Sequence, residues 1–73
     1  MGILRTLEQT LEDAERCLDE GDFSGAEKTL RKGLRRWKAS SELWTLAGEV
    51  AYEQGNAKEG VSSFREALVH SKV

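Results

Sequence analysis

Few side chains in this chain could carry out covalent chemistry, and their spacing does not combine them into an active site. Cys17 is the only cysteine and His70 the only histidine, and their separation in the sequence suggests no nucleophile–base pair. Cys17 stands between Ala14 and Leu18 on an apolar stripe, which favours a small buried hydrophobe over a nucleophile. The carboxylates are numerous, but no pair is singled out for acid–base catalysis. We therefore expect no catalytic residues and no enzymatic activity.

Metal and cofactor sites are not expected either. A structural zinc site takes about three or four Cys, His, Asp or Glu ligands, and no such group clusters in the sequence. The seven glycines stand singly rather than in the glycine-rich loop that binds phosphates. Because Cys17 has no partner for an internal disulfide, a reducing, cytoplasmic compartment is favoured.

Membrane binding is not expected from the amino-terminal segment. No apolar run approaches the roughly 20 residues that cross a bilayer, and residues 1–6 lack the apolar centre of a signal peptide. Gly2 and Thr6 fit the loose pattern for N-myristoylation. Gly2 suits the approach to a helix equally well, and we do not expect the modification.

Charge is segregated along the chain, although the net charge is only −2. Acidic residues dominate the first twenty positions, whereas the charged residues from Lys28 to Lys38 are all cations. A cationic helix that ends in Trp37 could bind nucleic acid or an anionic membrane. A solvated outer face is favoured, because Arg31 and Arg35 lie one turn apart and the aromatic platforms of nucleic-acid modules are missing. Nucleic acid is therefore not an expected partner.

Four amphipathic helices would position these side chains. Apolar residues at steps of three and four predict helices over residues 3–20, 23–37 and 57–71, and a third helix in chain order that begins at Ser40 or Ser41. The last helix is predicted to bury Val61, Phe64, Ala67 and Leu68. With 73 residues and no proline, the chain predicts one all-α domain over residues 1–73.

The chain also repeats itself after a shift of 34 residues, the spacing from Gly21 to Gly55. Gly21-Asp22 aligns with Gly55-Asn56, which predicts the same turn twice. Small residues recur where helices could pack closely. These aligned pairs are Ala14 with Gly48, Ala26 with Gly60, and Gly33 with Ala67. Such a period is typical of a helix-turn-helix solenoid, a scaffold that usually binds other molecules.

The second unit carries most of the diagnostic residues. They are Trp44, Gly48, Tyr52, Gly55-Asn56, Gly60, Phe64 and Ala67-Leu68. In the first unit Thr10 stands in place of the tryptophan and Cys17 in place of the tyrosine. With these residues the chain resembles the tetratricopeptide-repeat family, with repeat one over residues 7–40 and repeat two over residues 41–73. The resemblance implies two antiparallel helical hairpins stacked as a short right-handed solenoid.

Three features depart from the family pattern. The proline that commonly closes a unit is absent, since Lys38 and Lys72 stand there, and Ala47 replaces a large residue, which thins the core. Only two units are present, whereas stacked units normally number at least three. Self-association, docking on a larger assembly and a place within a longer array all stay open.

The resemblance also implies a concave groove lined by the first helix of each unit. By position, the groove-facing residues would be Glu8, Leu11, Glu15, Leu18, Asp19, Glu42, Thr45, Glu49, Tyr52 and Glu53. The Lys, Asn and Arg residues with which one variety of the family grips a chaperone carboxyl terminus are absent from these positions. An acidic groove would instead suit a basic or amphipathic segment.

We therefore expect a protein–protein interaction module that binds a peptide or partner helix, with Leu11, Leu18 and Tyr52 as apolar anchors. The first alternative is a homodimer that pairs through uncovered helix faces, with Phe64 and Leu68 in the contact. The weakest alternative is binding of an anionic polymer or membrane through the basic helix. Arg31, Arg35 and Trp37 would belong to such a secondary interface.

Overall fold

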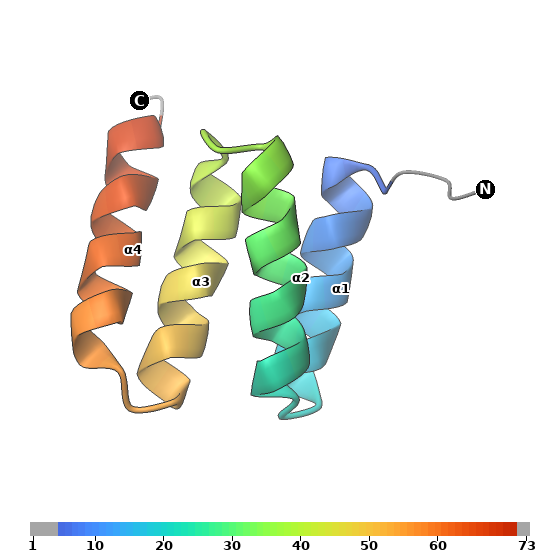
Figure 1. Cartoon of the computed structure of the whole chain (residues 1–73), viewed down its shortest axis with the longest axis horizontal. Helices are drawn as coiled ribbons and strands as arrows, with labels where there is room; N and C mark the ends of the chain where they lie inside the picture. Colours follow the sequence, from blue (N-terminus) through green and yellow to red (C-terminus); the bar gives the residue numbers. More distant parts are fainter. Residues whose placement is uncertain (1–4, 72–73) are drawn as a thin grey trace.

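The computed structural model describes residues 5–71, and these form four helices and no strand. The helices are α1 (Leu7–Asp19), α2 (Phe23–Arg36), α3 (Ser41–Glu53) and α4 (Ala57–His70). Consecutive helices run antiparallel, and α2, α3 and α4 lie side by side in chain order with α1 partly behind α2 (Figure 1). Contacts join α1 to α2 and α3, and α3 to α2 and α4. Among the described helices, α4 therefore touches α3 alone.

The first helix begins later than the apolar spacing predicts. Thr6 is its N-cap: the Thr6 hydroxyl accepts a hydrogen bond from the Gln9 backbone N–H, and the Gln9 side chain accepts one from the Thr6 N–H. This reciprocal pair satisfies two backbone donors and fixes the helix start at Leu7. The predicted stretch around Ile3 lies outside the described residues, as do Lys72 and Gly2, the residue of the loose myristoylation pattern.

The two hairpin turns are equivalent, as the repeat predicts. Gly21 and Gly55 have φ values of +75° and +79°, the left-handed conformation that glycine adopts without strain. Asp22 N–H donates to the Cys17 carbonyl over 2.7 Å, and Asn56 N–H donates to the Ala51 carbonyl over the same distance. The backbone therefore repeats the same helix-ending hydrogen bond after 34 residues.

Small residues allow the helices of each hairpin to approach closely. A Cβ atom added at Gly48 would lie 2.7 Å from the Phe64 ring, and one at Gly60 would lie 2.8 Å from the Tyr52 ring. Ala14 and Ala26 occupy the matching positions in the first hairpin and are completely buried. The predicted role of the small residues as helix contacts is confirmed.

The core runs between the two hairpins and is thinner than predicted at the last helix. It is built from Ala14, Ala26, Leu30, Leu43, Leu46 and Val50, with Cys17 partly buried against it. The prediction that Val61 and Leu68 are buried is wrong, because they are 40% and 76% exposed. Both side chains stay open to solvent because α3 is the only described helix that packs on α4.

Candidate partner-binding surfaces

Two adjoining hollows lie along α3. The first, of about 530 Å³, lies between α1 and α3, and the second, of about 480 Å³, extends it toward the α4 side chain Phe64. Leu18, Asp19 and Glu49 line both, so the hollows form one continuous surface, which we call the acidic groove. Its full set of lining residues is Leu11, Glu15, Leu18, Asp19, Phe23, Ser41, Glu42, Thr45, Leu46, Glu49, Tyr52, Glu53 and Phe64.

The acidic groove brings together nearly all the residues that the family resemblance places in a groove. Glu8 is the exception: it is exposed, one turn before Leu11 on α1, and lines neither hollow. Four lining residues were not predicted for the groove: Phe23, Ser41 and Leu46, and Phe64, which was expected in the core and in a dimer contact. The sequence did offer a signal for Phe23. It directly follows the Gly21-Asp22 turn, so it lies where α2 starts beside the end of α1.

The charge of the acidic groove has one sign. Its carboxylates come from α1 and α3, and none of the described lining residues is basic. They are Glu15, Asp19, Glu42, Glu49 and Glu53. Within residues 5–71 the carboxylates of Asp13 and Glu27 pair with arginines and that of Glu66 lies 3.4 Å from the His70 imidazole, whereas those of the groove have no such partner. The groove therefore presents uncompensated negative charge that a cationic segment can neutralise.

Apolar side chains interrupt the carboxylates at intervals. Leu11 and Leu18 are partly buried against the core, while Tyr52 is 47% exposed. The Tyr52 ring stacks on Phe64 with 5.5 Å between ring centroids, which holds it in place without burying it. The 34-residue shift pairs Tyr52 with Leu18, and pairs Cys17 with the buried Ala51 instead. Tyr52 is therefore a groove residue rather than the core counterpart of Cys17.

The residues of the proposed secondary interface do not come together. Trp37 caps the end of α2, where the Arg36 guanidinium lies 4.3 Å from its ring centroid. Arg36 also donates a hydrogen bond of 2.7 Å to the Arg5 carbonyl, and Arg31 pairs with Glu27 at 3.5 Å. Leu68 stands apart from these residues on the exposed face of α4. Two of the cations from Lys28 to Lys38 are thus engaged within the fold.

Metal and membrane features are not found in the described part of the chain. Residues 5–71 contain no group of three or more His, Cys, Asp or Glu side chains arranged to hold a metal ion. None of the four helices has the length and apolar character needed to cross a membrane. Comparison with protein-family models, curated proteins and solved structures finds no match to this chain.

Proposed function

We propose that this chain is a protein-interaction module of the tetratricopeptide-repeat type, and that its acidic groove binds a basic, amphipathic segment of a partner protein. One observation carries the proposal: carboxylates from two helices far apart in sequence line a single groove in which no described residue is basic. The repeated turns at Gly21 and Gly55 support the two-unit arrangement, because each unit then contributes its first helix to the same surface.

The chemistry of the groove defines the partner. Like charges gathered on one surface repel one another, and a cationic ligand relieves this repulsion while it is steered into place. Leu18 and the exposed ring of Tyr52 provide apolar contacts between the carboxylates. A segment that alternates cationic and apolar side chains fits this pattern, whereas a purely cationic segment leaves the apolar anchors uncovered.

A pair of synthetic peptides tests the proposal. A fluorescent 12-residue peptide that alternates Lys and Leu is expected to bind, and its counterpart with Glu in place of Lys is not. Glu49→Lys changes the residue shared by both hollows and is expected to weaken binding by roughly tenfold or more, since charge steering and pairing are both lost. The measurement is fluorescence polarisation at two salt concentrations.

The matched control is Glu12→Lys, a charge reversal at an exposed α1 position that lines neither hollow. It changes the net charge as much as Glu49→Lys does, and is expected to alter the affinity less than about threefold because exposed charges are screened. Equal losses in the two variants, or equal binding of both peptides, would show that the groove is not the binding site.

Self-association through α4 is the second candidate function, favoured by a separate observation. Leu68 and Val69 are 76% and 72% exposed on a helix that contacts only α3. A symmetric dimer would cover this face with its own copy. Light scattering over a range of concentrations measures the mass, and Leu68→Glu is expected to abolish any dimer. A wild-type chain that stays monomeric at high concentration rules this function out.

A further inference from the structure

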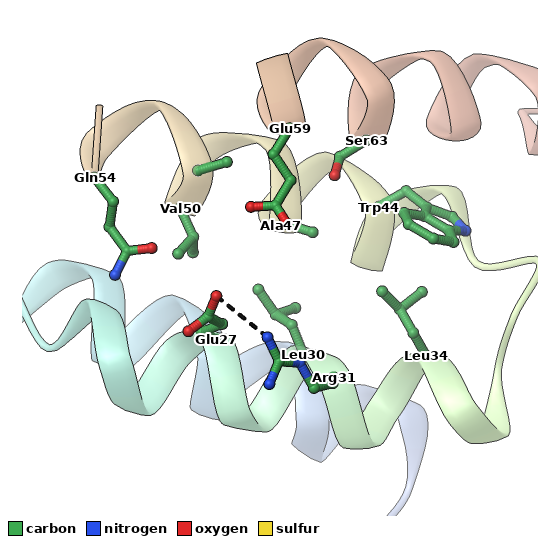
Figure 2. A pocket seen from close by; sticks show the side chains of 11 residues that line it. Glu27, Leu30, Arg31, Leu34, Trp44, Ala47, Val50, Gln54, Glu59 and Ser63 are labelled. Carbon is green, nitrogen blue, oxygen red and sulfur yellow. Dashed lines mark ion pairs between the residues drawn. The ribbon is translucent and has the colours of Figure 1, made fainter. Parts of the chain in front are cut away.

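A second pocket lies on the opposite side of α3 from the acidic groove. It occupies about 200 Å³ between α2 and α4, and side chains of α2 and α3 form its floor. Figure 2 shows its side chains, with Trp44 at one end, Gln54 at the other and Ala47 in the middle. None of its lining residues belongs to the acidic groove, so an inference about this pocket is independent of the proposed function.

The pocket exists because the side chain at its centre is small. The backbones of α2 and α4 do not come close to each other, so the space between them is bordered by side chains of both helices and depends on what α3 projects into it. At its centre α3 projects the single methyl group of Ala47. A larger residue here would occupy the pocket, which makes Ala47 the position that controls its volume.

The floor of the pocket is apolar and rigid. Leu30 and Val50 are 2% and 3% exposed and belong to the core, so they cannot swing into the pocket without disrupting it. Trp44 is fixed by its indole N–H, which donates a hydrogen bond of 2.8 Å to the Lys38 carbonyl. The floor thus offers preformed apolar contacts and the side of one indole ring.

The α4 wall carries two oxygen acceptors above this floor. Glu59 and Ser63, one turn apart, both point toward Ala47 (Figure 2). The Asn56 side-chain amide donates to Oε1 of Glu59 over 3.0 Å and so orients the carboxylate. On the facing wall Arg31 is paired with Glu27 at 3.5 Å. A carboxylate and a hydroxyl above an apolar floor match a ligand with a cationic head and an apolar body.

We propose that this pocket binds a small arylalkylamine, with the aromatic ring on the floor formed by Leu30, Ala47 and Val50 and the ammonium group between Glu59 and Ser63. The volume sets the class of ligand. Sites for drug-sized molecules occupy roughly 300–1,000 Å³, whereas an engineered apolar cavity of about 150 Å³ holds one benzene molecule. A pocket of about 200 Å³ therefore has room for one ring and a short amine tail.

Phenethylamine is the probe, and two-dimensional NMR of the labelled 73-residue chain is the measurement. The two tryptophans give separate indole N–H signals, which the spectrum of Trp37→Phe assigns. Trp44 lines the pocket and Trp37 does not. Saturable movement of the Trp44 signal at millimolar phenethylamine, with the Trp37 signal unchanged, is the expected result. No movement, or equal movement of both signals, overturns the proposal.

Two pairs of variants locate the ligand. Ala47→Leu fills the pocket and is expected to weaken binding at least tenfold. Ala57→Leu makes the same change at an exposed α4 position that lines neither this pocket nor the acidic groove, and is expected to change binding less than twofold. Glu59→Gln keeps the shape and removes the charge, with an expected loss of three- to tenfold. Its control, Glu66→Gln, lies two turns along α4 beyond the pocket lining.

The neutral analogue 2-phenylethanol separates the ring from the charge. It is expected to bind more weakly than phenethylamine and to be insensitive to Glu59→Gln. If both compounds bind equally, or Glu59→Gln weakens both alike, the assignment of the ammonium group to Glu59 is wrong. Binding that survives Ala47→Leu unchanged places the ligand elsewhere and overturns the site itself. Glu59→Gln serves as an independent check of the site, because Glu59 is exposed and its substitution leaves the core intact.

Discussion

The contact between α3 and α4 is set at single atoms. At Gly48 a methyl group would lie between 2.7 and 2.9 Å from three atoms of the Phe64 ring, well inside van der Waals contact. Phe64 in turn stacks on Tyr52, so the ring cannot move without disturbing the aromatic side of the acidic groove. One residue without a side chain therefore couples the packing of α3 on α4 to the shape of the binding surface.

Gly48→Ala is expected to destabilise the protein by about 1–2 kcal/mol, because overpacking outweighs the gain of about 1 kcal/mol in helix propensity. Thermal unfolding followed by far-ultraviolet circular dichroism measures the change. Phe64→Leu removes the obstructing ring atoms, so the same glycine substitution in that background should cost much less. An equal loss in both backgrounds would mean that the Phe64 ring is not the cause.

At the scale of the helices, the two hairpins are related by a 34-residue shift yet are capped differently. The Asp22 carboxylate accepts a hydrogen bond of 3.0 Å from the Gly25 backbone N–H at the start of α2. Asn56 occupies the same place before α4 but makes no side-chain cap, and its amide reaches Glu59 instead. The repeated turn therefore starts one helix with a cap and the other without.

Asp22→Ala is expected to lower the free energy of unfolding by about 1 kcal/mol, the usual contribution of an N-cap side chain. Asn56→Ala, at the equivalent position, should change it by less than about 0.5 kcal/mol, as at other exposed sites without a cap. Urea unfolding of the two variants in parallel makes the comparison. A larger loss at Asn56 than at Asp22 would contradict the difference in capping.

The helix boundaries at the two turns were predicted more accurately than the start of α1. Gly21 and Gly55 mark the turns because the chain there takes the left-handed backbone conformation, which both glycines adopt. The start of α1 was predicted too early, since apolar spacing continues past Thr6 and the Thr6–Gln9 capping pair was overlooked.

Burial and pockets depend on neighbours that periodicity does not specify. Leu68 continues the apolar stripe of α4, but the described chain places no helix over it, so its predicted burial was wrong. Most of the residues that line the acidic groove were named in advance, because the family resemblance assigns them positions on the first helix of each unit. The Glu59–Ser63 pocket was not, because it requires α2, α3 and α4 to be placed together.

At the scale of the whole molecule, the two ends of the helix row differ in chemistry. Asp13 on α1 pairs with Arg5 and with Arg16, the latter at 2.8 Å. The 34-residue shift places Asp13 at the position of Ala47, and Arg16 at that of the buried Val50. Where α3 packs on the preceding hairpin with apolar side chains, α1 therefore presents charges, whereas α4 exposes the apolar Val61, Leu68 and Val69 among charged side chains such as Arg65.

This difference between the ends limits how copies could join. Head-to-tail growth would press the exposed apolar side chains of α4 onto the ion pairs of α1 in the next copy, and desolvation of those charges opposes that contact. Symmetric pairing of two α4 helices instead covers Leu68 and Val69 of both copies. Because such a contact uses the same surface on both partners, it closes at two copies rather than lengthening into a fibre.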